Sequence, residues 1–185
     1  MNKEFTFSIF NDFSYMGIAE AIKNCNVENK QPVFICIGSD LILGDSLGPL
    51  IGTKIKEAKL PVYFYGSLGF PITAKEISYV KDYIKEIHPN SFIVAIDAAV
   101  GDDNDVGLIK VSDKGIMPGL GVKKKLGKVG DCGIMGIIAK RSTNNVELFN
   151  LTRLNLVYKA SDIIINGIKE YLNYLKNNEI FKKAQ

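Results

Sequence analysis

Three aspartates follow apolar runs in this chain, and their carboxylates are the side chains best suited to chemistry. Asp40 and Asp45 come shortly after the apolar run 33–37, and Asp97 comes directly after 92–96. Such runs indicate buried parallel strands, and ligands of open α/β sheets gather beyond the carboxyl ends of those strands. Two carboxylates in one cleft repel each other, so one pKa rises and the pair can divide into a base toward water and an acid. The spacing predicts a carboxylate site for hydrolysis or, as an alternative, for a divalent ion.

The two central aspartates differ in how easily an ordinary structural role explains them. Asp45 immediately precedes an expected helix, where aspartate is a preferred N-cap whose carboxylate accepts backbone N–H bonds. The sequence leaves capping and catalysis equally open for Asp45. Asp97 follows five apolar residues, so its carboxylate must be desolvated, hydrogen-bonded or paired, which favours a functional role.

Other kinds of site are disfavoured by the residues present. The glycines of segment 38–48 fit neither the dinucleotide fingerprint nor the P-loop. His88 is the only histidine, and we expect it at the surface, at the opposite sheet edge from the aspartates. This expected position argues against histidine-dependent nucleophiles and against histidine-rich metal sites. The odd cysteine count, without Cys-x-x-Cys spacing, indicates reduced thiols. We predict no obligatory metal or cofactor.

The elements that must position these residues alternate between strand and helix. Strands separated by helical crossovers predict a three-layer α/β/α sandwich with a mostly parallel sheet. We expect one domain over 1–185, with residues 1–30 as an N-terminal edge element and a glycine-rich irregular stretch at 112–141. The expected strands are 33–37, 62–65, 92–96 and 106–111, and the expected helices are 16–23, 47–57, 73–87 and the long amphipathic 151–177.

Composition limits the partners. The chain has 23 Lys and Arg against 20 Asp and Glu, a formal net charge of +3, which gives no electrostatic case for nucleic acid or an anionic membrane. We found no signal peptide and no stretch of roughly 20 apolar residues, so we expect a soluble cytoplasmic protein. The sequence leaves homo-oligomerisation open.

Several motifs together resemble the YyaC sporulation proteins over about residues 33–141. They are Cys36-Ile-Gly-Ser-Asp40, Gly44-Asp-Ser-Leu-Gly-Pro49, Ile96-Asp-Ala98, Ile116-Met-Pro-Gly-Leu-Gly-Val122 and Val129-Gly-Asp131. That family resembles the germination protease of endospore formers and, more distantly, hydrogenase maturation endopeptidases. The resemblance implies a phosphorylase/hydrolase-like fold and a sporulation-associated endopeptidase that acts on a protein or peptide.

The resemblance also assigns residues. It implies that Asp45 and Asp97 are catalytic. Beside this, the position of Asp40 after the first strand makes it a candidate third acid, and the glycine-containing loops predict substrate-binding positions at Gly38, Ser39, Gly44, Pro118, Gly119 and Gly121. The maturation endopeptidases bind metal through two acidic residues and a histidine, and that histidine has no counterpart here. Two alternatives remain: a non-catalytic peptide- or metal-binding protein of spore development, and a metal-dependent maturation-type peptidase. In each case the expected location is the cytoplasm of a sporulating cell.

Overall fold

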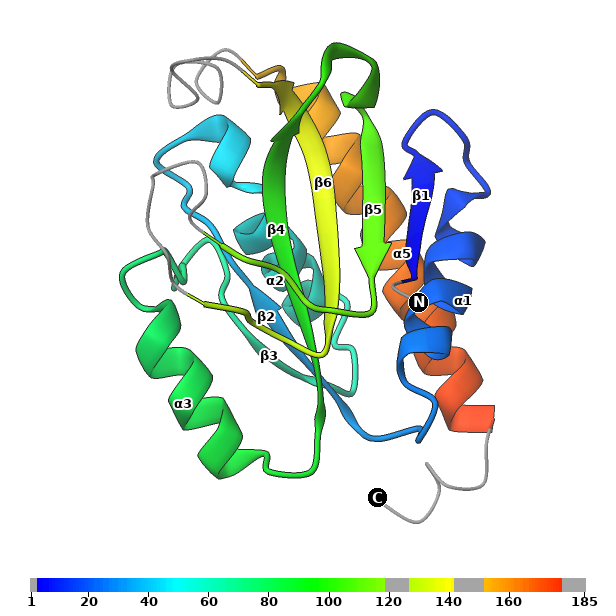
Figure 1. The fold of residues 1–185 in the computed structure, drawn as a ribbon, viewed down its shortest axis with the longest axis vertical. Helices are drawn as coiled ribbons and strands as arrows, with labels where there is room; N and C mark the ends of the chain where they lie inside the picture. The colour runs from blue at the N-terminus through cyan, green and yellow to red at the C-terminus, as the bar shows by residue number, and fades with distance from the viewer. Residues whose placement is uncertain (1–2, 119–126, 142–151, 178–185) are drawn as a thin grey trace.

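A six-stranded sheet runs through residues 3–118, 127–141 and 152–177, which are the residues that this computed structural model describes (Figure 1). The strand order is β1-β5-β6-β4-β2-β3. Neighbouring strands pair in parallel from β3 through β2 and β4 to β6, whereas β5 is antiparallel to both β6 and β1. The strands are β1 (Glu4–Ser8), β2 (Pro32–Cys36), β3 (Tyr63–Tyr65), β4 (Phe92–Gly101), β5 (Leu108–Ser112) and β6 (Cys132–Lys140).

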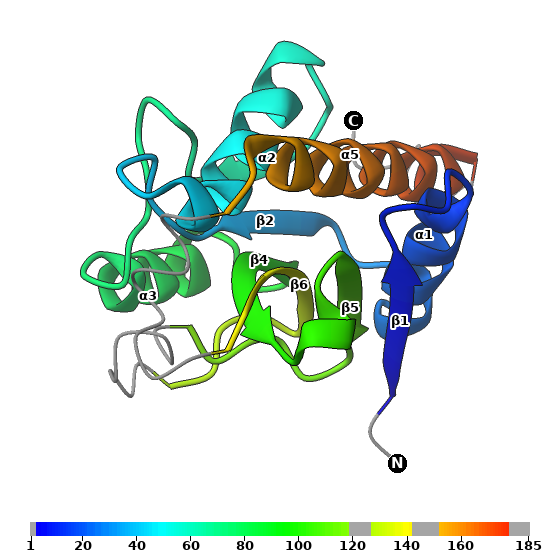
Figure 2. The ribbon, with the colours of Figure 1, turned by 90° about the horizontal axis from the view of Figure 1, so that it is seen from above.

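Helices cover both faces of this sheet because the strand side chains alternate in direction (Figure 2). Phe34 and Val94 point into a core with α1 (Ser14–Cys25), α2 (Leu47–Glu57) and α5 (Leu154–Asn177). Their neighbours along the strands, Val33 and Ala95, pack on the opposite face with α3 (Ile77–Ile87). The described residues thus form an α/β sandwich, as the alternation of strands and helices predicts. None of the helices in these ranges combines the length and apolarity needed to cross a membrane.

Strand β6 shows where the sequence-based prediction was wrong. Residues 132–140 fall in the stretch predicted to be irregular, yet they form a strand between β4 and β5. The glycines reflect close packing: a Cβ atom at Gly136 would lie 2.4 Å from Cδ2 of Leu47. A glycine inside a strand can mark such a close approach as readily as a loop. Strand β1 was also missed, although Phe5 and Phe7 alternate with polar residues in the manner of a strand.

Strand β4 is longer than expected and changes the setting of Asp97. The apolar run predicts an end at residue 96, but pairing with β6 continues to Gly101 and places Asp97 opposite Met135. Strand β2, on the other side, ends at Cys36 opposite Ile96. Asp97 therefore lies inside β4 but just beyond the carboxyl end of β2, where the chain leaves the sheet toward α2.

Candidate active site

Asp97 lies on the α3 face of β4. Its side chain follows those of Ile93 and Ala95 at every second residue, and Ala95 belongs to the core under α3. The carboxylate is half-buried, and its Oδ1 accepts a hydrogen bond of 2.8 Å from the Ala98 N–H. Burial raises the pKa of Asp97 well above its usual range, and the negative charge of Asp45 raises it further. The hydrogen bond from Ala98 opposes this rise only in part.

Asp45 reaches the same region from the loop between β2 and α2. It ends a short 3₁₀ helix, η1 (Leu43–Asp45), and the Ser39 N–H donates to its backbone oxygen at 3.0 Å. The loop folds back this tightly because Gly38 has φ of +137°, and a Cβ atom there would lie 2.0 Å from the Asp45 carbonyl oxygen. Burial raises the pKa of Asp45 to about 6, against a smaller opposing effect of the Ser39 backbone.

The capping explanation for Asp45 does not hold in the structure. Helix α2 begins at Leu47, and its N-cap residue is Ser46, with no capping hydrogen bond from a side chain. The Ser46 hydroxyl donates instead to the Leu43 carbonyl oxygen at 2.6 Å. Asp45 is therefore half-buried next to Asp97 without serving as the helix cap, which leaves its carboxylate for chemistry.

The remaining predicted site residues differ in burial, and two of them lie outside the described ranges. Gly44 is buried within η1, and Pro118 is buried at the end of a described range. Asp40 is exposed on the same loop as Ser39 and is not among the charges that shift the pKa of either half-buried aspartate. Gly119 and Gly121 lie outside the described residues.

His88 takes no part in the aspartate site. It follows α3 and is half-buried, where a surface position was expected. Its Nε2 lies 2.8 Å from the Tyr65 hydroxyl, and its ring centroid lies 4.6 Å from that of Tyr63 on the edge strand β3. These contacts give the histidine a structural setting away from both carboxylates.

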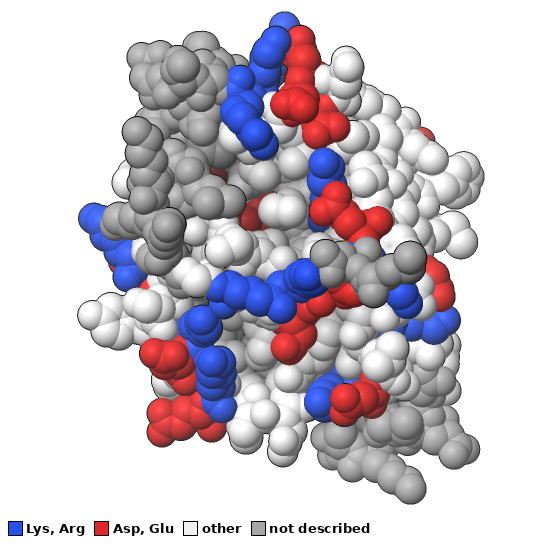
Figure 3. Space-filling view, viewed as in Figure 1, with Lys and Arg blue, Asp and Glu red and all other residues white. Residues whose placement is uncertain are grey.

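Two exposed apolar residues near the aspartates were not predicted. Leu41, 89% exposed, lies on the loop after β2, and Phe70, 80% exposed, lies on the loop after β3. The Gly38 N–H donates to the Ile72 carbonyl oxygen at 2.9 Å and joins the two loops. Figure 3 shows acidic atoms recessed in a hollow on this face of the molecule. The clue in the sequence was the presence of apolar residues in both loop-like segments: Leu41, Ile42 and Leu43 in the first, and Leu68 and Phe70 in the second.

The electrostatic arrangement favours acid–base chemistry. Burial raises the pKa of Asp45 to about 6, and burial together with the Asp45 charge raises the pKa of Asp97 well above its usual range. Two carboxyls whose surroundings shift their pKa values differently can divide into one proton donor and one acceptor. Within the described ranges, no group of three or more His, Cys, Asp or Glu side chains is placed to hold a metal ion.

Comparisons with known proteins agree with the motifs. A family profile described as "Protein of unknown function (DUF1256)" matches residues 8–167, a span that contains both half-buried aspartates. The "Uncharacterized protein YyaC" of Bacillus subtilis (strain 168) is 37% identical over 140 residues, which are 75% of this chain and 68% of that protein. These matches confirm the resemblance to YyaC and do not extend to the germination protease or the maturation endopeptidases.

Proposed function

The chain belongs to the DUF1256 family, and we propose that it is an endopeptidase in which Asp45 and Asp97 activate water against a peptide carbonyl. The observation that carries the proposal is the meeting of two half-buried carboxylates beyond the carboxyl end of β2. Buried charges of like sign are costly and need a compensating role. The resemblance to the germination protease motifs supports the same two residues.

The proposed reaction uses the different protonation of the two aspartates. Asp45 takes a proton from water as the water oxygen bonds to the carbonyl carbon, and Asp97 gives its proton to the carbonyl oxygen. The tetrahedral diol that results then collapses: Asp45 passes its proton to the amide nitrogen, and Asp97 regains one from a diol hydroxyl. The C–N bond breaks to give a carboxylic acid and an amine, and both aspartates return to their starting states.

The surroundings of the pair suit a polypeptide substrate. The loops after β2 and β3 expose Leu41 and Phe70, and side chains of this kind can hold apolar residues of an extended chain. The two loops are joined at their base by the hydrogen bond from the Gly38 N–H to the Ile72 carbonyl oxygen. We infer that Leu41 and Phe70 contribute to substrate binding, while the aspartates act on the peptide bond.

Cleavage of a proteome-derived peptide library tests the proposal. The library is incubated with the wild type, Asp45→Asn, Asp97→Asn and the control Asp12→Asn, which alters an exposed aspartate outside the site. New N-termini are then mapped by mass spectrometry. We expect defined cleavage sites with the wild type and the control, and at least about a hundredfold slower cleavage with each site variant. Wild-type cleavage that equals that of the Asp45→Asn/Asp97→Asn double variant would refute the proposal.

The same library separates the two alternatives. Cleavage that is lost on chelation and restored by one added divalent ion would replace the proposal with a metal-dependent peptidase. Peptides that co-purify with the wild type, remain intact and are released by Asp97→Asn would replace it with a peptide-binding protein.

For the setting of the activity, we infer the cytoplasm of a cell that is forming a spore, supported by the resemblance to sporulation proteins. A fluorescent fusion expressed from the native promoter in the source organism tests this inference. We expect a diffuse signal that begins with sporulation, and a constant signal in vegetative cells would contradict it.

A further inference from the structure

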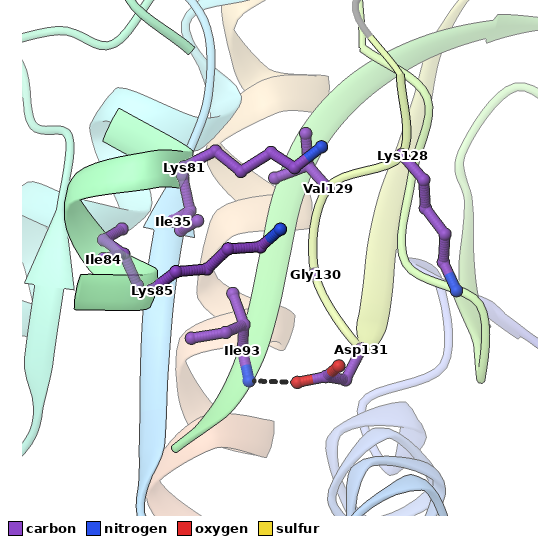
Figure 4. Close-up of a pocket in the computed structure, with 9 residues that line it drawn as sticks. All are labelled: Ile35, Lys81, Ile84, Lys85, Ile93, Lys128, Val129, Gly130 and Asp131. Atoms are coloured by element: carbon purple, nitrogen blue, oxygen red, sulfur yellow. Dashed lines mark hydrogen bonds between the residues drawn. The ribbon is translucent and has the colours of Figure 1, made fainter. Parts of the chain in front are cut away.

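A cavity lies between α3 and the sheet, and neither Asp45 nor Asp97 lines it (Figure 4). Its volume is about 260 Å³, enough for a small organic molecule. The apolar part of its lining comes from β2, α3, β4 and the chain just before β6: Ile35, Ile84, Ile93 and Val129. An occupant with an apolar body would therefore find an apolar surface on several sides.

Lysines surround this cavity. Lys81 and Lys85 are one helical turn apart on α3, and Figure 4 shows both extending across the front of β4 toward the 129–131 segment. A Cβ atom at Gly127 would lie 3.8 Å from Lys81 Nζ, so this ammonium reaches the far wall. Lys128 lies on the other side of that segment, with its ammonium directed away from α3. A band of basic side chains also crosses this face of the molecule in Figure 3.

These positive charges have no partner among the residues that the structure describes. Ion pairs there involve five other lysines, and none involves Lys81, Lys85 or Lys128. Asp131 is the one carboxylate among the residues that line the cavity, and its Oδ2 accepts a hydrogen bond of 2.8 Å from the Ile93 N–H rather than an ion pair from a lysine. Elsewhere the chain is nearly balanced in charge, so this local excess is a distinct feature.

We propose that this cavity binds a small organic anion, whose oxyanion group is held by Lys81 and Lys85 and whose apolar body contacts Ile35, Ile84 and Ile93. Ammonium groups form strong charge-assisted hydrogen bonds with phosphate and carboxylate oxygens. The volume limits the occupant to a small molecule. Phosphate esters and organic carboxylates share this chemistry, and the experiment below distinguishes them.

The lysine-lined cavity is close to the aspartate site but does not include its residues. Ile93, in its lining, and Asp97 lie on the same face of β4, four residues apart, or about 13 Å along the strand. A bound anion would join α3 to the segment before β6, nearer than Asp97 to the start of β4. The binding proposal does not depend on peptidase activity and can be tested in its absence.

Isothermal titration calorimetry with phenyl phosphate, benzoate and neutral phenol tests the proposal on the full-length protein at low salt. We expect at least one of the two anions to bind saturably with a Kd at or below about 1 mM, and phenol not to bind measurably. Tighter binding of phenyl phosphate would assign the site to phosphate esters, and tighter binding of benzoate to carboxylates. Both results support an organic anion site.

Matched variants connect the binding to the cavity. The double variant Lys81→Gln/Lys85→Gln should weaken binding at least about tenfold, and Lys81→Arg/Lys85→Arg should keep most of it. The control Lys169→Gln/Lys176→Gln removes the same charge from exposed positions on α5, across the sheet, and should bind like the wild type. No saturable binding of either anion up to about 10 mM, or equal weakening in the control, would overturn the proposal.

Discussion

Replacing Asp45 with asparagine removes a charge that the fold holds at a cost. Burial raises the pKa of this aspartate from 3.8 to about 6, so between these values the native state keeps a proton that the unfolded chain releases. Stability attributable to this residue therefore falls as the pH rises through that window, and the full penalty applies above about pH 6. At about 1.4 kcal/mol per pH unit, the shift corresponds to an upper limit of about 3 kcal/mol.

Asparagine cannot ionise, but it has nearly the same shape and keeps an acceptor oxygen. Because the Asp45 side chain is only half-buried, water reduces the penalty, and we expect Asp45→Asn to gain about 1–2 kcal/mol of unfolding free energy at pH 8. At pH 3.5, where the carboxyl is mostly protonated in both the native and the unfolded wild type, the gain should be close to zero.

Urea unfolding at a series of pH values from 3.5 to about 8 measures this difference directly. The control Asp12→Asn changes an exposed aspartate and should follow the wild-type curve at every pH. A variant that is no more stable than the wild type at pH 8, or a gain of equal size at both ends of the series, would show that burial does not penalise the Asp45 charge.

Three further results are expected. In Asp45→Asn, the pKa of Asp97, measured by carbon-13 NMR of its carboxyl, should fall because the repulsion from Asp45 is removed. It should stay above its usual range because burial is the larger cause of the shift. An unchanged pKa would mean that the two carboxylates do not interact. For the wild type, kcat/KM should rise with pH through about 6 as Asp45 ionises and decline once Asp97 loses its proton; a flat profile would contradict this acid–base assignment. Gly38→Ala should lower the urea midpoint of unfolding and abolish cleavage, because the Cβ atom of the alanine would collide with the Asp45 carbonyl oxygen. An unchanged midpoint and an unchanged cleavage rate would show that the loop adapts to the methyl group.

The sequence was most informative where local pattern decides structure. The bounds expected for the second helix, 47–57, are those of α2, and the apolar run 33–37 marks β2, whose five residues are all buried. Helix α3 begins four residues later than expected, because the Thr73 N–H and hydroxyl bond the Glu76 carboxylate in a turn before it. Helix boundaries are uncertain by one or two residues in any case, and a turn of this kind moves the start of the helix further along the chain.

The sequence was least informative where distant segments decide structure. The extension of β4 past Asp97 depends on pairing with β6, and no local pattern in either segment specifies that register. The lysine cavity likewise joins α3 to the chain before β6, which is more than 40 residues further along in the printed sequence. Asp45 and Asp97 were identifiable as candidates from their neighbours, and so was their repulsion if they shared a cleft, whereas the burial that is the largest cause of both raised pKa values follows only from the folded arrangement.

The contact between Leu47 and Gly136 has a consequence for the geometry of the site. Leu47 comes two residues after Asp45, and Gly136 comes one residue after Met135, the partner of Asp97 across the sheet. Because position 136 has no side chain, Leu47 packs directly against β6, and this contact holds the start of α2 close to the strands. A methyl group added at this residue, which has no chemistry of its own, would collide with Leu47 and push the segment that carries Asp45 away from the sheet that carries Asp97.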